Sequence, residues 1–202
     1  MEFFLSLIPL VSKFFFVTNP IGNTPTIISL VKDYDFAKQK RIMIREGIFA
    51  LLIALFFQFF GEFFLGLLNI QDYALTLCGG SLLLIVAFSM IFNVEQPTDI
   101  QKPKAEPFIV PIATPILTGP GLMAMIMLYS RIENNQLKIT AAILVAWVGI
   151  LSVLAVGPYL QRVFGKRGLV ALEQLMGMIL AFISTEMLVN GVSLFLKNFK
   201  GN

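Results

Sequence analysis

A seven-residue stretch, Asn-Pro-Ile-Gly-Asn-Thr-Pro at 19–25, interrupts an apolar run that extends from Phe3 to Val31. Proline removes a helical hydrogen-bond donor and clashes with the carbonyl four residues before it. In hydrocarbon there is no water to satisfy the freed backbone groups. Such a break therefore persists only where protein buries it or where it lines a wet cavity. A chain with this stretch is restricted to membrane folds that keep a broken helix away from lipid.

The composition supports an integral membrane protein. Of the 202 residues, 57% are hydrophobic and only 13% are charged, whereas a soluble domain carries about a quarter charged residues. At roughly 20 apolar residues per span, the chain has room for about six spans and no separate soluble domain. The basic residues are scattered through loops and form no interaction tail. We therefore expect membrane lipid, and no nucleic acid, as a partner.

Six hydrophobic segments are predicted. The first is too long for one span, which fits a helix broken at Pro20–Pro25, and it contains Lys13. This lysine either snorkels, or follows an interfacial helix that ends before Phe14, or pairs with an acid in the bundle. The segments cover 3–31, 46–68, 73–93, 108–131, 139–160 and 169–196.

Lys and Arg residues are distributed unequally between the loops. Ten of the 15 fall in the loops after the first, third and fifth spans, and four fall in the other loops and the C-terminal tail. Because basic residues concentrate in cytoplasmic loops, the protein is predicted to be a multi-pass plasma-membrane protein with both termini extracytoplasmic.

A second proline motif, Thr-Pro-Ile-Leu-Thr-Gly-Pro-Gly at 114–121, interrupts the fourth segment. Its two prolines lie 95 residues after those of the first motif. Two further features recur in the same order. Gly61 and Gly157 are 96 residues apart, and two stretches that run from Gly to Met begin 97 residues apart, at Gly80 and Gly177. Three landmarks in order indicate an internal repeat.

The repeat divides the chain into residues 1–94 and 108–202, joined by a polar linker at 95–107. Three spans in each half make the halves face opposite sides of the membrane. Inverted repeats are typical of secondary transporters, whose substrates bind near the midplane at discontinuous helices in matching positions. The predicted fold is all-α, with six transmembrane helices in two inverted three-helix repeats and with helices one and four broken by Pro and Gly.

Four motifs resemble those of the MarC family of bacterial and archaeal inner-membrane proteins. They are Asn-Pro-x-Gly-Asn-x-Pro at 19–25, Gly-Glu at 61–62, Gly-Gly at 79–80 and Pro-x-Ala-x-Pro-x-x-x-Gly-Pro-Gly at 111–121. The resemblance covers almost the whole chain. It implies a six-span architecture near that of the LysE-type exporters, and one branch of the family is described as transporting small neutral amino acids.

Broken helices expose free backbone N–H and C=O groups, and a half-helix N-terminus offers partial positive charge to a carboxylate. Freed carbonyls suit a cation or an ammonium group, so two breaks together fit a zwitterionic amino acid. In the alternative interpretation the prolines only kink two helices, and the polar residues cap the kinks. The predicted substrate-binding residues are Asn19, Pro20, Gly22, Asn23, Thr24, Thr114, Pro115, Thr118, Gly119 and Gly121.

Glu186 lies well inside the sixth segment, where an acid costs about 2.5–3.5 kcal/mol even on mild scales and usually marks an ion or proton path. Glu186, with the repeat-aligned Ser89, is the predicted site of proton or cation coupling. The alternatives are a neutral Glu186 bonded to a neighbouring helix, or a pair with Lys13. In the MarC family, as the resemblance implies, Gln is common at the position of Glu186, Asp at that of Ser89 and Arg at that of Thr76. The acidic residue of the family's first half is therefore replaced here by one in the second half.

The leading hypothesis is therefore an inner-membrane secondary transporter or exporter of a small solute, with small neutral amino acids first. A channel, a lipid scramblase or a non-transporting partner subunit is also compatible with the breaks. An intramembrane enzyme is disfavoured, because the sequence has no His, no metal-ligand cluster and a lone Cys78 without a base in view. We expect no cofactor and no metal, and a homo-oligomer stays open.

Overall fold

The computed structural model describes residues 2–92, 106–133 and 135–200. The predicted linker at 95–107 falls outside the described residues except for its last two positions. In the described part the regular structure is helical, apart from one bridge between Phe108 and Val110. The helices are α1 (Glu2–Thr18), α2 (Pro20–Val31), α3 (Phe36–Leu67), α4 (Asp72–Ile91), the π-helical turn η1 (Ile112–Leu117), α5 (Pro120–Ile132) and α6 (Gln136–Lys200).

Four stretches of the described helices are long and apolar enough to cross a membrane. They are Phe36–Leu67, Asp72–Ile91, Gln136–Leu160 and Arg167–Phe199. The last two belong to α6 and are called here its first arm and its second arm. Between them the helix bends at Gly165, which has a φ of 61°, a conformation that glycine adopts without steric cost. The predicted basic turn after the fifth span is thus a bend within one helix.

The other two hydrophobic segments are broken, as predicted. Between α1 and α2, Asn19 adopts a left-handed conformation with φ 52° and ψ 53°. Between η1 and α5 the chain passes through Thr118 and Gly119. Pro20 and Pro120 each begin the helix that follows its break, at a position where the missing N–H has no helical partner to lose.

The α3 helix begins earlier than the sequence predicted. The prediction placed a basic loop at 32–41 and a span from residue 46, whereas α3 already begins at Phe36. The carboxylate of Asp35 accepts a hydrogen bond from the Lys38 backbone N–H at 3.2 Å, and this cap fixes the helix start. The run of apolar residues predicted only the hydrophobic part of α3 and not its polar first turns.

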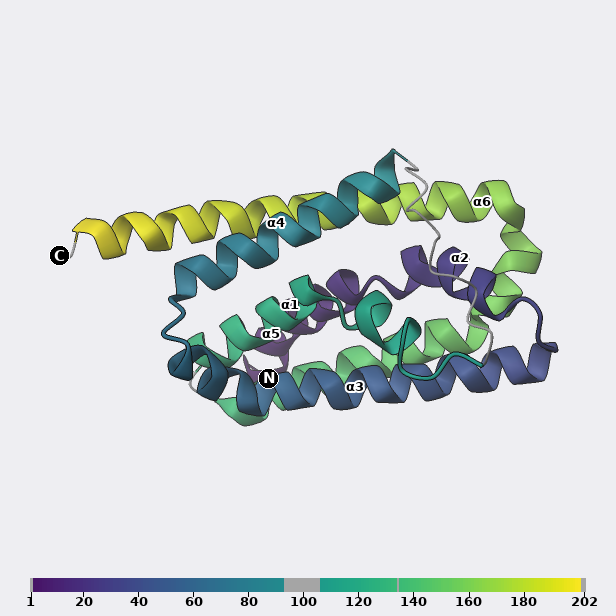
Figure 1. Ribbon diagram of the computed structural model, residues 1–202, viewed down its shortest axis with the longest axis horizontal. Helices are drawn as coiled ribbons and strands as arrows, with labels where there is room; N and C mark the ends of the chain where they lie inside the picture. Colours follow the sequence, from purple (N-terminus) through teal and green to yellow (C-terminus); the bar gives the residue numbers. More distant parts are fainter. Residues whose placement is uncertain (1, 93–105, 134, 201–202) are drawn as a thin grey trace.

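The loops gather at two opposite ends of the molecule (Figure 1). At one end the Phe36 ring lies 4.6 Å from the Tyr159 ring and 5.0 Å from the Arg162 guanidinium. At the other end Arg131 forms a 2.9 Å ion pair with Asp72. The chain termini lie toward this second end, called here the terminal end (Figure 1). The loops after the first and fifth predicted spans therefore lie together at one end, and those after the second and fourth lie together at the other.

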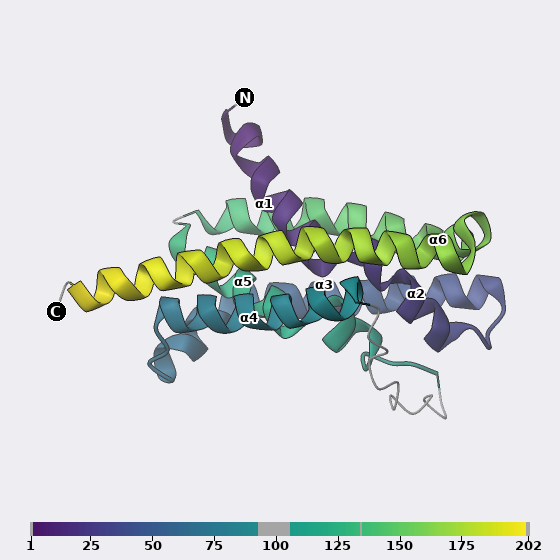
Figure 2. The same cartoon turned by 90° about the horizontal axis from the view of Figure 1, so that it is seen from above.

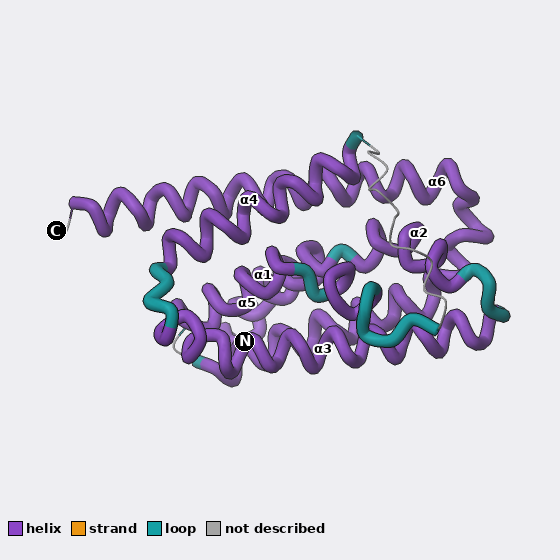
Figure 3. Tube along the Cα trace, in the orientation of Figure 1, coloured by secondary structure: helices purple, strands orange, loops and turns teal. Residues whose placement is uncertain are grey.

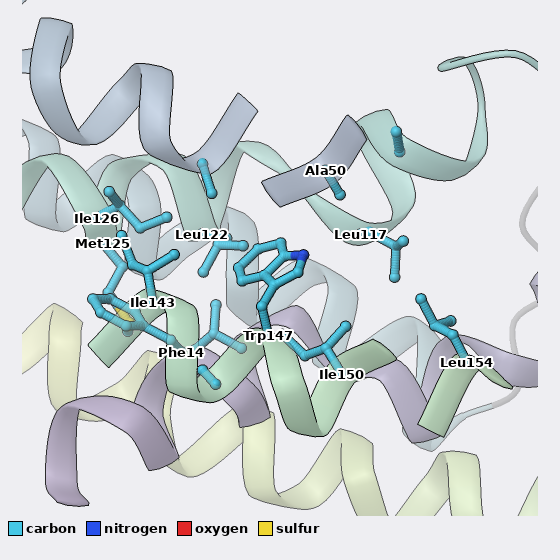
Figure 4. Close-up of a cluster of buried hydrophobic side chains, with 14 of the residues drawn as sticks. Phe14, Ala50, Leu117, Leu122, Met125, Ile126, Ile143, Trp147, Ile150 and Leu154 are labelled. Carbon is cyan, nitrogen blue, oxygen red and sulfur yellow. The ribbon is translucent and has the colours of Figure 1, made fainter. Parts of the chain in front are cut away.

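The core is packed around Trp147 of the first arm, which is 1% exposed (Figure 4). Its indole N–H donates to the carbonyl of Gly47 at 2.8 Å, so the largest core side chain also ties the first arm to α3. Buried side chains near it come from α1, α3, η1, α5 and α6, and include Phe14, Ala50, Leu117, Leu122, Met125, Ile126, Ile143, Ile150 and Leu154.

The second arm of α6 packs along α4 in the antiparallel sense (Figures 1 and 2). A methyl group added at Gly80 would lie 3.1 Å from the Cβ atom of Met187, and one added at Gly177 would lie 2.9 Å from the Cβ atom of Met90. Gly177 is the residue 97 positions after Gly80, and Met90 is the residue 97 positions before Met187, so the two contacts correspond to each other. Such reciprocal contacts are what a two-fold axis between two helices produces.

We expect Gly80→Ala and Gly177→Ala each to lower the free energy of unfolding by about 1–3 kcal/mol, because the added methyl groups overpack the contact. Gly66→Ala is the matched control, since nothing lies within 4 Å of a methyl group there. Thermal unfolding in detergent micelles measures the three variants. Equal melting temperatures would show that α4 and the second arm are not closely packed.

Candidate functional site

The two broken helices meet in the middle of the molecule, where Figure 3 shows their non-helical segments near each other. The side-chain amide of Asn23 donates two hydrogen bonds to backbone carbonyls. One goes to Thr18 at 3.0 Å, at the end of α1, and the other goes to Ile116 at 3.1 Å, in η1. Asn23 therefore joins the first break to the second across 93 residues of sequence.

Asn19 occupies the turn of the first break and is 4% exposed. Its side-chain oxygen accepts from the Gly22 backbone N–H at 3.1 Å and so caps α2. Its amide nitrogen lies 3.1 Å from the sulfur of Met90 on α4. Asparagine tolerates the left-handed conformation and is a strong N-cap residue. The local chemistry therefore explains why the chain breaks at Asn19, whereas Pro25 lies inside α2.

Threonine hydroxyls supply the other polar groups at the breaks, and each donates to a backbone carbonyl. Thr24 is fully buried and bonds to Pro20 at 2.7 Å. Thr118 is also fully buried and reaches across to Ala50 of α3 at 3.1 Å. Thr114 bonds to the carbonyl of Thr118 at 3.3 Å. The capping that the kink interpretation expects is thus present, together with bonds that run between the broken helices and to α3.

The predicted glycines are positions of close packing. Gly22 lies against Met90 and Asn19, and Gly121 lies against Leu83. A methyl group at Gly119 would lie 3.0 Å from a backbone oxygen. That oxygen belongs to Pro115, which lies within η1. Larger residues at these glycines would push α4 and the two broken segments apart.

Glu186 forms an ion pair with Lys13, which is one of the alternatives that the sequence left open. The lysine Nζ atom lies 2.9 Å from Glu186 Oε1 and 3.0 Å from the Tyr129 hydroxyl. The lysine side chain is 27% exposed and that of Glu186 is 52% exposed. The group joins α1, α5 and the second arm of α6. Ser89, in contrast, lies next to Met90 and hence at the level of Gly177, about 13 Å along the helix from Glu186.

A second charged cluster, which sequence reasoning missed, surrounds Arg45. The guanidinium lies 2.9 Å from Glu46 and 2.6 Å from Glu106, and it also bonds to the Pro107 carbonyl. The Glu46 side chain is fully buried, and its Oε2 atom has no hydrogen-bond partner in the described structure. Hydrogen bonds from Lys38 and Arg45 lower the pKa of Glu106. Adjacent Arg and Glu at the start of an apolar segment are the signal that could have identified this cluster.

Comparisons with known proteins identify relatives along most of the chain. The family model described as MarC family integral membrane protein matches residues 4–196. The UPF0056 inner membrane protein YhgN of Escherichia coli K12 is 36% identical over 183 residues, which cover 90% of this chain and 93% of that protein. A UPF0056 membrane protein of Chlamydia trachomatis is 35% identical over 190 residues, or 93% of each chain. No solved structure matches.

We expect Asn23→Leu to lower the free energy of unfolding by at least about 1–3 kcal/mol, because two backbone carbonyls lose their donor and one unpaired buried acceptor already costs that much. Ser29→Ala is the control, since this exposed hydroxyl on the same helix also donates to a backbone carbonyl, that of Thr26 at 2.7 Å. Unfolding by sodium dodecyl sulfate in mixed micelles measures both. Equal stability of the two variants would contradict the role of Asn23 as a link between the breaks.

We expect Arg45→Gln to destabilise the fold by about 2–4 kcal/mol, because it leaves the buried Glu46 without its counter-ion. Adding Glu46→Gln should restore part of this loss, since it removes the stranded charge. Lys38→Gln is the control, because Lys38 also pairs with Glu106 at 3.1 Å but is exposed, and exposed pairs contribute about 0–1 kcal/mol. Melting curves in detergent compare the variants, and no rescue by the double substitution would count against the pairing.

Proposed function

We propose that this chain, which belongs to the MarC family of integral membrane proteins, is a secondary transporter of a small solute in the inner membrane. The observation that carries the proposal is the contact between the two breaks through Asn23. Transporters with inverted repeats bind their substrates where two discontinuous helices meet. Two independent kinks could each be capped locally, whereas here a side chain at the first break also bonds to the backbone of the second.

Small neutral amino acids are the proposed substrates. The helices α2 and α5 both begin at the breaks, and their N-termini offer partial positive charge to a carboxylate. The carbonyls of Thr18 and Ile116, now occupied by Asn23, are acceptors that an ammonium group can take when Asn23 releases them. Met90 packs closely against Gly22 at the first break, which favours a substrate with a small side chain over one with a large side chain. Both charges of an amino acid thus find complementary dipoles.

The inverted six-span architecture is part of the proposal. The reciprocal contacts of Gly80 with Met187 and of Gly177 with Met90 support a two-fold relation between the third span of each half. The alternation of loops between the two ends supports six crossings, of which two are the broken pairs. By the positive-inside rule, the excess of Lys and Arg in the loops opposite the terminal end supports an orientation with both termini outside the cytoplasm.

The ion pair of Lys13 and Glu186 is the proposed coupling site. It joins the first broken helix to the second arm of α6, and Tyr129 joins it to the second broken helix. Binding of a proton by Glu186 would remove one charge of the pair and release Lys13 from the second arm. An event at Glu186 would in this way change the contacts of both broken helices, which is the connection that coupled transport needs.

Purified protein in liposomes tests the proposal. We expect saturable uptake and counterflow of radiolabelled glycine, alanine or serine, because a carrier has a finite number of sites. Uptake that does not saturate would indicate a channel, and the absence of counterflow across a wide panel of small solutes would refute the proposed function.

In the same assay, Glu186→Gln is expected to remove the pH dependence of uptake. Glu173→Gln is the matched control, because Glu173 lies on the same arm and is described without a charged partner. Unchanged uptake and pH dependence in Glu186→Gln would overturn the coupling role while leaving the carrier proposal intact.

A further inference from the structure

One face of the second arm of α6 is exposed along its length and changes polarity halfway. Its residues follow one another at intervals of three or four, so they lie on a single face of the helix. From the bend toward the C-terminus the face carries Leu175, Met178, Phe182, Glu186, Asn190, Ser193 and Lys197. The first three are apolar and the last four are polar or charged. These last four are called here the polar stripe.

Contacts with α4 set the depth of the stripe in the membrane. The α4 helix has 20 residues, or about 30 Å, which is the thickness of the hydrocarbon core. The side chain of Gln174 bonds to the carbonyl of Ile91 at one end of α4, and Phe195 packs on Tyr73 at the other. Met187 contacts Gly80, near the middle of α4. Its neighbour Glu186 therefore lies level with the middle of α4, in the central part of the hydrocarbon core.

The stripe runs from this centre to one surface only. At 1.5 Å per residue, Asn190, Ser193 and Lys197 lie about 6, 10 and 16 Å from Glu186 toward the terminal end. On the other side of the centre the same face is closed by Phe182, which is 71% exposed. The polarity of the face thus changes where the membrane midplane crosses it.

Lipid is a poor neighbour for the polar half. In the described structure neither Asn190 nor Ser193 has a hydrogen-bond partner outside the stripe, and both are exposed. Polar groups in hydrocarbon without partners cost several kcal/mol each, and charged residues in a membrane face protein or a water-filled cavity. Water is the partner that satisfies all members of the stripe at once.

The outer part of the stripe lies open in the described structure. An open groove of about 290 Å³ lies on its outer part, lined by Val189, Val192, Ser193, Leu196 and Lys197. At the inner end Lys13 of α1 reaches Glu186. From there α1 diverges from α6 toward its N-terminus (Figure 2). No contact with α1 beyond Glu186 therefore covers the polar stripe in the described structure.

We propose that the polar stripe is one wall of an aqueous half-channel that leads from the terminal side of the membrane to the ion pair of Lys13 and Glu186. Phe182 ends the path at the midplane. The half-channel gives water, and with it a proton or a small cation, access to Glu186 from one side only. Its role in coupling rests on the proposed transport function, but its existence can be measured without transport.

Cysteine accessibility tests the half-channel. Asn190→Cys and Ser193→Cys are each made in a Cys78→Ala background and treated in membrane vesicles with a charged, membrane-impermeant methanethiosulfonate. We expect both to react at least about tenfold faster than a thiol at the same depth in lipid, because only the thiolate reacts and neither it nor the reagent enters hydrocarbon. Reaction is expected from the terminal side alone.

The chain offers controls at matched depth and on the matched face. The native Cys78 is exposed on α4, next to Leu77, which packs on Gly191, so unmodified protein reports a lipid-facing thiol at the depth of Asn190. Met178→Cys, in the Cys78→Ala background, lies on the same face beyond Phe182 and should stay unlabelled from the terminal side.

The half-channel is overturned if Asn190→Cys and Ser193→Cys react no faster than Cys78, as they would when lipid or a second copy of the chain covers the stripe. It is also overturned if Met178→Cys reacts as fast as Ser193→Cys, which would mean a continuous pore. Labelling without uptake would refute the carrier and retain the half-channel, whereas uptake without labelling would refute only the half-channel.

Discussion

The rest of this structure depends on one constraint, which is that a backbone N–H or C=O group in hydrocarbon has to find its partner within the protein. The two prolines of each proline motif remove donors that a continuous helix would supply. The chain satisfies the breaks with side chains, since Asn19 caps α2, Asn23 serves two carbonyls and Thr118 reaches α3. Those bonds place the two breaks beside each other, so the same requirement that makes a broken helix costly also assembles the centre of the fold.

Local chemistry made the breaks predictable. Asn19, Pro20 and Pro120 each have a backbone preference that shows in the sequence, and the structure places the interruptions at these residues. The start of α3 at Phe36 was missed, because hydrophobicity reports where a bilayer ends while the cap by Asp35 decides where the helix begins. The cluster around Arg45 was missed for another reason. Its partner Glu106 lies 61 residues away, and no local pattern joins them.

The sequence identified the polar groups at the breaks but not their pairing. Asn23 was predicted to offer its amide to a substrate, and in the structure that amide is bound to Thr18 and Ile116. Substrate binding by Asn23 is energetically compatible with these two hydrogen bonds. A net hydrogen bond contributes about 0.5–1.5 kcal/mol, so releasing both bonds costs about 1–3 kcal/mol. Millimolar binding of a solute corresponds to about 4 kcal/mol, so a substrate that replaces both bonds can displace the amide.

The halves share landmarks, yet their charges differ, and the difference has a structural cause. Shifting the polar stripe back by 97 residues brings Glu186 onto Ser89, but the equivalents of Asn190 and Ser193 fall beyond Ile91, where α4 has already ended. The second arm continues to Lys200. In the described structure, only the second arm therefore continues a polar stripe beyond the position at which Ser89 and Glu186 align. A nearly symmetric frame with one such helix offers different routes to its two sides, so a proton or a cation reaches Glu186 more readily from one side, while the gradients across the membrane set the direction of net transport.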